Sequence, residues 1–343
     1  MIKLGLDMER MRNPYSGLAV YCKGLSGALS KIKDLECTFF YPANHPQTNS
    51  KNDTYAGSGS KVFGIHAPKL QLFHATHQNS KLYVRGIPRV TTLHDLNFIE
   101  KYKNNRIKRT FAIWTLNRLI QKSSAINYIS NYTKMMAEEY LNNRFLKNTR
   151  VIYNGVDFNP ANIKTPFVAP ETFFFSIGVI NPKKNFHVLL PLVKKTGIPI
   201  VIAGIDTHAY VAKIKSLAEK EQIASLVHII GPVSSEEKNW YYKHCKALLF
   251  PSLSEGFGYP IIEAMSYGKP VFLSRLTSMP EIGSSFAYYF DSFEANSMFN
   301  VLQNGLDTEI NHPTFSQERI QYASQFTWAA AANQYFKMYQ SVL

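Results

Sequence analysis

Short apolar segments alternate with longer helical patterns along the whole chain, and this alternation constrains the fold more than any other feature. Strands are predicted over 2–6, 36–41, 71–74, 89–94, 125–129 and 150–153, and again over 172–177, 199–203, 226–230, 246–250, 270–273 and 286–290. Helices are predicted at about 17–31, 106–122 and 131–142, and at about 184–195, 209–222, 235–243 and 260–267. The strands of the second half are continuously apolar, which is typical of parallel strands covered by helices on both faces. We therefore predict an α/β protein with two doubly wound, Rossmann-like sheets.

The length of 343 residues also favours two domains over a single core. The stretch 154–170 contains three prolines and one glycine and is predicted to link a domain over 1–160 to one over 170–325. The polar segment 43–60 is predicted to be a long loop, either a lid or a disordered excursion. Ligands bind beyond the carboxyl ends of parallel strands, so we expect a site in a cleft between the domains.

The composition is that of a folded protein, with 45% apolar and 18% charged residues and no apolar run long enough to span a bilayer. The N-terminus carries charges where a signal peptide needs apolar residues, so we interpret it as a strand. Three scattered cysteines without a CxxC pair indicate reduced thiols, a cytoplasmic setting and no structural zinc.

The positive charge is confined to the first half of the chain. Residues 1–165 carry 24 Lys and Arg against 10 Asp and Glu, a net of 24 − 10 = +14, which is the formal net charge of the entire chain. The imbalance therefore points to an anionic partner of the N-terminal half.

The segment 252–271 (SLSEGFGYPIIEAMSYGKPV) follows a predicted strand and leads into a helix near Pro260. Gly256 and Gly258 allow the backbone to approach a ligand, and amides at a helix start favour an anion. Carboxylates at Glu255 and Glu263 suit the hydroxyls of a sugar or a ribose. The same spacing also fits a plain helix N-terminus whose acidic residues complement the dipole.

A second feature is the turn after strand 172–177, where Gly178 leads into VINPKKN. Lys183 and Lys184 at this turn could hold a diphosphate and stabilise the charge that builds on it as it leaves. Solvated surface lysines are the alternative.

Together these segments resemble family 4 of the glycosyltransferases, retaining enzymes of the GT-B architecture, and in particular bacterial mannosyltransferases of surface polysaccharide synthesis. The resemblance extends over most of the chain, in the sequence order expected. It includes 13–25 (NPYSGLAVYCKGL), 91–96 (TTLHDL), 149–157 (TRVIYNGVD), 276–283 (LTSMPEIG) and 326–339, the last implying a C-terminal helix over 326–343 that crosses back to the first domain.

The resemblance implies a role for each matching residue. Gly17 gives the donor phosphate and the acceptor room, and His94 hydrogen-bonds the transferred sugar, although a histidine there could also be a core residue. Lys184, with Lys183, binds the diphosphate. The remaining donor contacts are Glu255 and the amides of Gly256, Phe257 and Gly258 for the sugar, and Glu263 for the ribose.

The chain departs from the family pattern at the diphosphate site. Val179 stands where arginine is frequent, and Lys183 replaces the arginine of Arg-Lys-Asn, so diphosphate binding is expected to rest more heavily on Lys184. Gly17 is single where many relatives have a glycine pair.

The resemblance implies a nucleotide-sugar donor, best assigned as GDP-mannose, and a lipid-linked or lipopolysaccharide, O-antigen or capsule acceptor. The chain has no Asp-x-Asp motif, so we expect no metal and no cofactor, with lysines and helix amides meeting the leaving-group charge. Retention is then expected to proceed by front-face attack.

The segment 101–122 contains seven basic residues and no acidic one, with Phe111, Ile113 and Trp114 interleaved. It predicts peripheral binding to the anionic inner face of the cytoplasmic membrane. The basic patch consists of Lys101, Lys103, Arg106, Lys108 and Arg109. An ordinary amphipathic helix with Ala112, Leu116, Leu119 and Ile120 in the core accounts for the same pattern.

Two other functions remain open. A sugar-nucleotide epimerase of the same architecture would need no acceptor, and incubation with donor alone distinguishes it. A basic membrane- or nucleic-acid-binding protein without catalysis would leave the neutral second half and its paired glutamates without a role, and no RNA-type aromatic platform is evident.

Overall fold

The computed structural model describes residues 1–13, 16–42, 53–56, 69–146, 148–160, 162–207 and 209–343. The chain forms two compact units, described in turn below. Unit 1 comprises Met1–Gly155 together with Phe326–Leu343, and unit 2 comprises Val156–Gln325. The stretch predicted as a linker lies against unit 2, where Lys164 N donates to Glu236 O (3.3 Å) and the Tyr241 hydroxyl donates to Val168 O (2.6 Å).

Unit 1 is built on one parallel sheet in the order β3-β2-β1-β4-β5-β6-β7. Its strands are β1 (Ile2–Asp7), β2 (Leu35–Pro42), β3 (Asp53–Ala56), β4 (Leu72–Ala75), β5 (Arg89–Leu93), β6 (Ala125–Tyr128) and β7 (Thr149–Val151). Its helices are α1 (Gly17–Leu29), α3 (Phe98–Lys101), α4 (Arg106–Ile120), α5 (Asn131–Tyr140) and α13 (Trp328–Gln340), with short 3-10 turns η1 (Glu9–Arg12) and η2 (Asn143–Phe145).

Unit 2 repeats the scheme with the order β10-β9-β8-β11-β12-β13, again all parallel. The strands are β8 (Phe174–Ile177), β9 (Ile200–Ala203), β10 (Val227–Gly231), β11 (Ala247–Phe250), β12 (Val271–Ser274) and β13 (Tyr288–Phe290). The helices are α6 (Leu190–Thr196), α7 (Ala209–Lys220), α8 (Ser235–His244), α9 (Tyr259–Ser266), α10 (Met279–Gly283), α11 (Ala295–Asn311) and α12 (Phe315–Ala323), and the 3-10 turns are η3 (Pro182–Lys184), η4 (Phe186–Leu189), η5 (Ala224–Leu226) and η6 (Ser284–Phe286). The prediction of two doubly wound sheets is confirmed.

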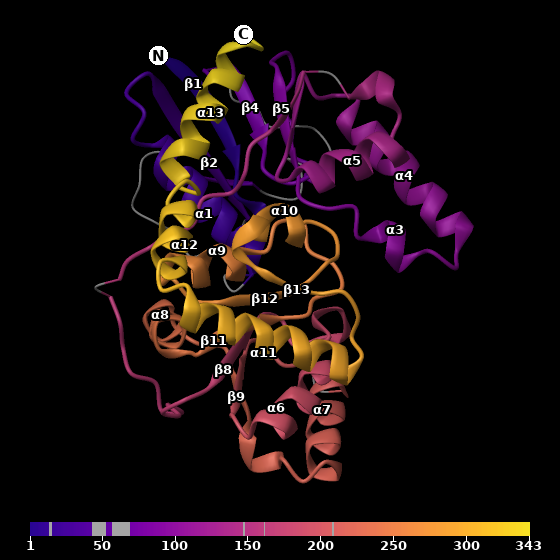
Figure 1. Ribbon diagram of the computed structural model, residues 1–343. Helices are drawn as coiled ribbons and strands as arrows, with labels where there is room; N and C mark the ends of the chain where they lie inside the picture. Colours follow the sequence, from indigo (N-terminus) through magenta and orange to yellow (C-terminus); the bar gives the residue numbers. More distant parts are fainter. Residues whose placement is uncertain (14–15, 43–52, 57–68, 147, 161, 208) are drawn as a thin grey trace. The chain divides into compact units, whose positions relative to one another are not determined.

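Local predictions were wrong where tertiary contacts override local propensity. The segment 43–60 was predicted to be loop throughout, but Asp53–Ala56 form β3, paired with β2 at the sheet edge. The rest of that segment, and with it the lid proposal, lies outside the described residues. Helix α11 was not predicted because its sequence is rich in asparagine. It is capped by the Glu294 carboxylate and packs against α6 and β13 (Figure 1).

The C-terminal helix α13 completes the core of unit 1, as the resemblance implied, and lies beside α1 (Figure 1). Its tyrosines enter a buried polar network, in which the Tyr335 and Tyr21 hydroxyls lie 2.7 Å apart and the Tyr339 hydroxyl lies 2.7 Å from His74 Nδ1. Thr92 Oγ1 joins both groups, at 2.9 Å from His74 Nε2 and 2.9 Å from the Tyr335 hydroxyl. These contacts fasten α13 to the centre of the sheet.

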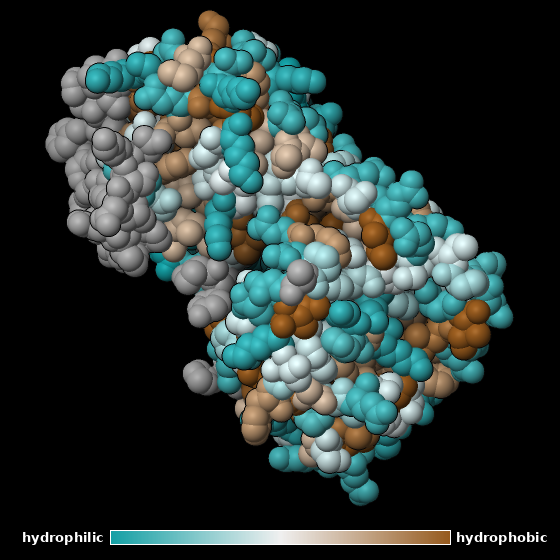
Figure 2. All heavy atoms as spheres, turned by 90° about the vertical axis from the view of Figure 1, so that its left-hand side faces the viewer, coloured by the Kyte–Doolittle hydropathy of each residue, from teal (hydrophilic) through white to brown (hydrophobic). Residues whose placement is uncertain are grey.

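The surface is mixed in polarity. On the face shown in Figure 2, hydrophilic side chains predominate and hydrophobic ones occur singly or in small groups. Within the described ranges, no helix combines the length and the apolar character that crossing a bilayer requires.

The packing of α13 on α1 requires glycine at position 24, because only glycine leaves room for the Trp328 ring. A Cβ at Gly24 would lie 2.0 Å from the Trp328 ring, whereas a Cβ at Gly27 on the same helix would meet nothing within 4 Å. We expect Gly24→Ala to lower the free energy of unfolding by about 1–3 kcal/mol through overpacking. Gly27→Ala is the matched control and should raise that free energy by up to about 1 kcal/mol. Chemical denaturation measures both, and equal effects of the two variants would contradict the packing.

The burial of three histidines makes the stability of unit 1 decrease at low pH. It lowers the pKa of His74 to about 3, of His77 to about 2 and of His94 to about 4. In the unfolded chain these histidines are protonated as the pH falls below about 6.5, whereas in the folded unit they stay neutral to a much lower pH. The free energy of unfolding is therefore unaffected by them above about pH 6.5 and decreases as the pH drops below it. Each histidine contributes about 1.4 kcal/mol per pH unit in this window. Denaturant titrations from pH 7 to pH 4 should show the loss, and His74→Asn should reduce its slope; a flat profile would refute the prediction.

Candidate active site

The sheet of unit 2 places two loops side by side at its carboxyl edge. β8 pairs with β9 on one side and with β11 on the other, so the chain leaves these neighbouring strands in opposite directions. In such sheets the ligand site lies beyond this switch point, because the connections diverge and leave the strand ends open. The segments that follow the two strands are 178–185 and 251–258, the two segments singled out in the sequence.

The first loop is shaped so that Lys184 can reach across to the second. The Asn181 carboxamide accepts from Lys183 N at 3.0 Å and opens η3, and Asn185 ends it in the left-handed conformation (φ 58°). Gly178 has a φ of +143°, and a Cβ on it would lie 2.8 Å from Lys184 Cε. Glycine at this position therefore leaves room for the lysine side chain.

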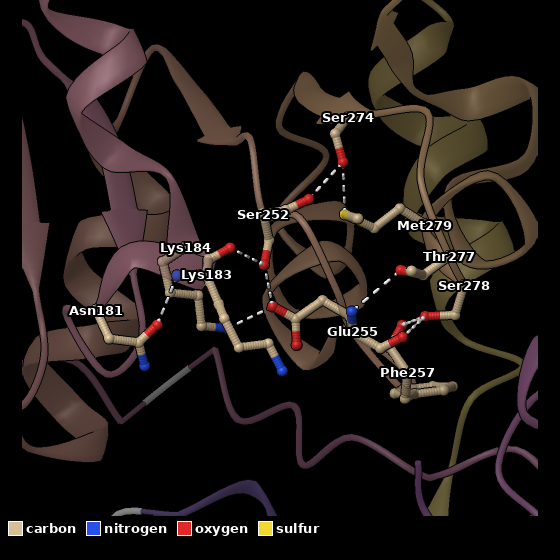
Figure 3. Close-up of polar contacts among 10 residues, drawn as sticks. All are labelled: Asn181, Lys183, Lys184, Ser252, Glu255, Phe257, Ser274, Thr277, Ser278 and Met279. Carbon is tan, nitrogen blue, oxygen red and sulfur yellow. Dashed lines mark hydrogen bonds and ion pairs between the residues drawn. The ribbon is translucent and has the colours of Figure 1, made fainter. Parts of the chain in front are cut away.

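Lys184 and Glu255 are in direct contact. Lys184 Nζ lies 2.5 Å from Glu255 Oε1, which also accepts from Ser252 Oγ at 2.6 Å (Figure 3). Both side chains are 17% exposed, and Lys184 Nζ lies 4.9 Å from the centre of the Phe250 ring. The described residues supply no donor to Glu255 Oε2. A carboxylate oxygen and an ammonium thus meet at the switch point with capacity for further hydrogen bonds.

Lys183 is exposed and contributes differently from Lys184. Its carbonyl oxygen accepts from Leu253 N at 2.7 Å, and Ser252 Oγ, which donates its proton to Glu255 Oε1, lies 3.3 Å away. The backbone of Lys183 therefore ties the two loops together, while its ammonium remains on the surface.

Glu263 belongs to a separate cluster between α8 and α9. Its carboxylate accepts from Lys238 Nζ at 2.5 Å and from the Tyr242 hydroxyl at 2.7 Å. Neither partner was predicted from the sequence, because no local pattern relates residues on α8 to a glutamate on α9.

The glycine-rich loop ends at the start of α9. Gly258 is the N-cap residue and has a φ of +96°, a conformation that favours glycine, and Pro260 occupies the first turn as predicted. Phe257 is buried beneath the loop. The turn of the glycine-rich loop places the amides of 256–258 at the start of α9, beside Glu255.

Three hydroxyl residues, at the end of β12 and directly after it, hold this loop, and none of them was predicted as a site residue from the sequence. Ser274 Oγ donates to Ser252 O at 2.6 Å, and Thr277 and Ser278 contact the backbone of 255–257 (Figure 3). The signal that could have found them is a run of hydroxyl residues just before a proline, in the segment quoted for the family resemblance.

His94 and Gly17 lie in unit 1. Gly17 is the first residue of α1, where Ser16 Oγ accepts from Ala19 N at 3.2 Å. His94 follows β5, and its Nε2 lies 2.7 Å from Thr76 O. A carbonyl can only accept, so Nε2 carries the proton, and Nδ1 has no partner among the described residues.

The His94 ring is held from two sides and is neutral at pH 7. Tyr21 packs edge-on at 4.6 Å between ring centres, and His77 stacks at 5.7 Å. Arg10 Nη2 donates to His77 Nδ1 at 2.9 Å. Burial lowers the pKa of His94 to about 4, so Nδ1 offers a lone pair to a hydroxyl. The sequence analysis did not single out His77 or Arg10.

The basic patch lies on α3, on α4 and on the turn between them, and all of its members except the half-buried Arg109 are exposed. Lys103 pairs with Glu100 at 2.6 Å. Leu116 and Ile120 are buried, as the amphipathic interpretation required, whereas Ala112 and Leu119 are half-buried. Ile113 packs against the hydrophobic core and is therefore not a surface residue.

An apolar ridge accompanies the patch. Ile107, Phe111 and Trp114 are 84%, 65% and 51% exposed, and the last two rings stack at 5.8 Å. Spaced by four and three residues, they lie along one face of α4. Arg118 lies over the Trp114 ring at 4.8 Å.

Two family models match adjoining parts of the chain. "Glycosyltransferase Family 4" matches residues 62–159, and "Glycosyl transferases group 1" matches residues 159–300.

Curated relatives carry mannosyltransferase names. The chain is 26% identical to the serotype-specific mannosyltransferase WbdA of Escherichia coli, over 70% of this chain and 30% of that protein. It therefore spans about a third or less of the length of WbdA. It is 22% identical to the O-antigen chain mannosyltransferase B of Escherichia coli, over 99% of this chain and 100% of the relative.

Solved structures share the fold along the entire chain. A sucrose-phosphate synthase from Thermosynechococcus elongatus superposes with a TM-score of 0.79 at 16% identity, covering 100% of this chain and 99% of that one. Anabaena Alr3699/HepE, solved with UDP and glucose, gives 0.77 at 17% identity, covering 99% and 100%. The two parallel sheets, the adjoining family models and these relatives agree: the chain carries a glycosyltransferase family 4 domain followed by a glycosyl transferases group 1 domain.

Proposed function

We propose that the protein transfers mannose from GDP-mannose to a lipid-linked glycan acceptor of the lipopolysaccharide, O-antigen or capsule type. The observation that carries the proposal is the contact between Lys184 and Glu255 at the switch point of unit 2. This contact brings together Lys184, which is suited to a diphosphate, and Glu255, which is suited to sugar hydroxyls. The mannosyltransferase names of the relatives support the choice of sugar.

Lys184 binds the donor diphosphate and stabilises the charge that develops on the departing phosphate oxygen. In the free protein its ammonium is already ordered by Glu255 and by the Phe250 ring, so little reorganisation is needed when the phosphate arrives. Lys183, exposed on the same loop, adds a second positive charge. These two lysines and the amides at the start of α9 meet the leaving-group charge without a metal ion.

Each unit supplies residues whose own geometry suits part of the donor, and the family resemblance gives their roles. Glu255 accepts hydrogen bonds from sugar hydroxyls through Oε2, while Ser252 and Lys184 hold Oε1. His94 accepts one through Nδ1, because Thr76 fixes the opposite nitrogen as the donor. Glu263 receives the ribose hydroxyls with its carboxylate oriented by Lys238 and Tyr242, and Gly17 leaves space for the phosphates.

The reaction proceeds with retention at the anomeric carbon. The acceptor hydroxyl attacks from the face that the diphosphate leaves, and the departing phosphate oxygen takes the hydroxyl proton. The protein supplies position and charge.

The acceptor side is a membrane surface. The basic patch attracts an anionic leaflet at about 1 kcal/mol for each charge. The ridge of Ile107, Phe111 and Trp114 inserts its apolar side chains among the lipids. The protein therefore works peripherally at the inner face of the cytoplasmic membrane.

Glu255→Ala and Lys184→Ala should each lower the turnover of GDP-mannose by at least about 100-fold, because each removes a group that contacts the donor. Each also leaves the other charged side chain of the ion pair without its partner. Release of GDP, measured with a lipid-linked mannan acceptor, reports the loss. Glu221→Ala and Lys194→Ala are matched controls, since that pair (2.8 Å) is exposed on the same unit away from the switch point. Near-wild-type turnover in both site variants would refute the site.

A thermal-shift panel of GDP-, UDP- and dTDP-sugars tests the donor. GDP-mannose should raise the melting temperature of the wild-type protein most, and Lys184→Ala should abolish the shift. A larger shift with a UDP- or dTDP-sugar would mean that this sugar, and not GDP-mannose, is the donor. Isomerisation of the donor in the absence of acceptor would favour an epimerase.

Neutralising Lys101, Lys103, Lys108 and Arg109 with glutamine should release the protein from vesicles that contain phosphatidylglycerol, because electrostatic attraction to the surface is lost. Sedimentation with the vesicles measures binding. Trp114 fluorescence should shift to the blue on binding in the wild-type protein.

The control replaces the same number of exposed lysines on unit 2, namely Lys194, Lys213, Lys215 and Lys243. It removes equal charge and should leave vesicle binding intact. Equal losses in the two variants would mean that net charge alone binds the vesicles, and unchanged binding in both would refute the membrane surface.

A further inference from the structure

Thr277 adopts a backbone conformation that a β-branched residue rarely takes. Its φ is 55°, and the other non-glycine residues with positive φ in the described chain are Asn148, Asn185, Gln222 and Ser284, none of them β-branched. Such a conformation persists only where the surrounding structure enforces it, and it is concentrated at functional sites. Thr277 lies between β12 and α10, directly against the glycine-rich loop.

Thr277 and Ser278 hydrogen-bond to the backbone of that loop. Thr277 Oγ1 accepts from Glu255 N at 3.0 Å. Ser278 Oγ lies within hydrogen-bond distance of two carbonyl oxygens, Glu255 O at 3.0 Å and Phe257 O at 3.2 Å (Figure 3). Ser278 is completely buried, so its hydroxyl serves the interior and not the solvent.

These bonds decide which way the loop amides point. In a planar trans peptide, the carbonyl of one residue and the N–H of the next point in opposite directions. The carbonyls of Glu255 and Phe257 turn toward Ser278, so the N–H groups of Gly256 and Gly258 turn to the opposite side. The hydroxyl pair therefore sets the direction of the amides that the sugar would meet.

We propose that Thr277 and Ser278 are positioning residues, which hold the backbone of 255–257 so that the Glu255 carboxylate and the Gly256 and Gly258 amides are presented to the sugar of the donor. This inference rests on the proposed function of Glu255. Neither residue touches the donor; both act through the loop. The strain at Thr277 is kept because the left-handed backbone brings its hydroxyl to Glu255 N.

Hydrogen exchange tests the positioning without any ligand. Thr277→Gly accepts the positive φ but loses the hydroxyl, whereas Thr277→Ser keeps the hydroxyl. We expect the Glu255 amide, whose hydrogen bond Thr277 Oγ1 accepts, to exchange at least about tenfold faster in Thr277→Gly and, because the loop backbone loosens, in Ser278→Ala, and at the wild-type rate in Thr277→Ser.

Two controls separate this effect from general loosening. Gln222→Gly relieves a positive φ of 60° on an exposed residue remote from the loop. Ser266→Ala removes a buried hydroxyl that donates to Ile262 O at 2.8 Å within α9. Both should leave exchange of the loop unchanged, and wild-type exchange in Thr277→Gly and Ser278→Ala would overturn the inference.

Ligand affinities then connect the loop to the sugar. Titration calorimetry compares GDP-mannose with GDP, so that the difference reports contacts to the sugar alone. Thr277→Gly and Ser278→Ala should weaken GDP-mannose by about tenfold and leave GDP within about twofold, while Thr277→Ser restores the difference. Equal weakening of both ligands would indicate a merely structural role.

The same titrations with Glu255→Ala separate the two hypotheses. If Glu255→Ala binds GDP-mannose as the wild-type protein does, the proposed function of the site fails. If Glu255→Ala loses the sugar contribution while Thr277→Gly and Ser278→Ala retain it, the positioning role alone is refuted.

Discussion

The pairing of β8 with β11 is the constraint on which the candidate site depends. Hydrogen bonds place Phe174 beside Ala247 and Phe175 beside Leu248, although these residues are more than seventy positions apart in the sequence. Parallel pairing brings both carboxyl ends to one edge, and the reversal of strand order there keeps the edge uncovered. Lysine and glutamate can meet because of this register, since neither is near the other along the chain.

Once the two loops are adjacent, charge determines their arrangement. The Lys184 and Glu255 side chains are mostly withdrawn from water, so each would be costly to leave without its partner. Their contact offsets part of that cost in the empty protein and keeps both groups ordered. In the proposed complex, a diphosphate would bind the Lys184 ammonium and the hydroxyls of the sugar would donate hydrogen bonds to Glu255. The electrostatics of the free site are thus matched to a ligand that has an anionic part next to a hydroxylated part.

The alternation of apolar segments and helical patterns was sufficient to predict both sheets, because buried parallel strands need continuous apolar runs and leave a clear trace. Lys184, Glu255 and Gly258 could be singled out because turn chemistry and helix starts are local properties. Thr277, Ser278 and Lys238 were not singled out, because their importance depends on which distant segments the fold places together. Helix α11 and strand β3 were missed for a related reason: packing against α6 and β13, or pairing with β2, supplies what their polar sequences lack.

The return of α13 to unit 1 has a consequence for how the chain folds during synthesis. Unit 2 is continuous, and all of its strands have been made once residue 325 is complete. Unit 1 must wait, because Trp328, Tyr335 and Tyr339 fill its core and the two tyrosines hydrogen-bond to Tyr21 and His74, which are made some three hundred residues earlier. A nascent chain therefore carries an unfinished first sheet until α13 has left the ribosome. Although the strands of unit 1 are translated before those of unit 2, unit 1 can complete its fold only after all of unit 2 has been made.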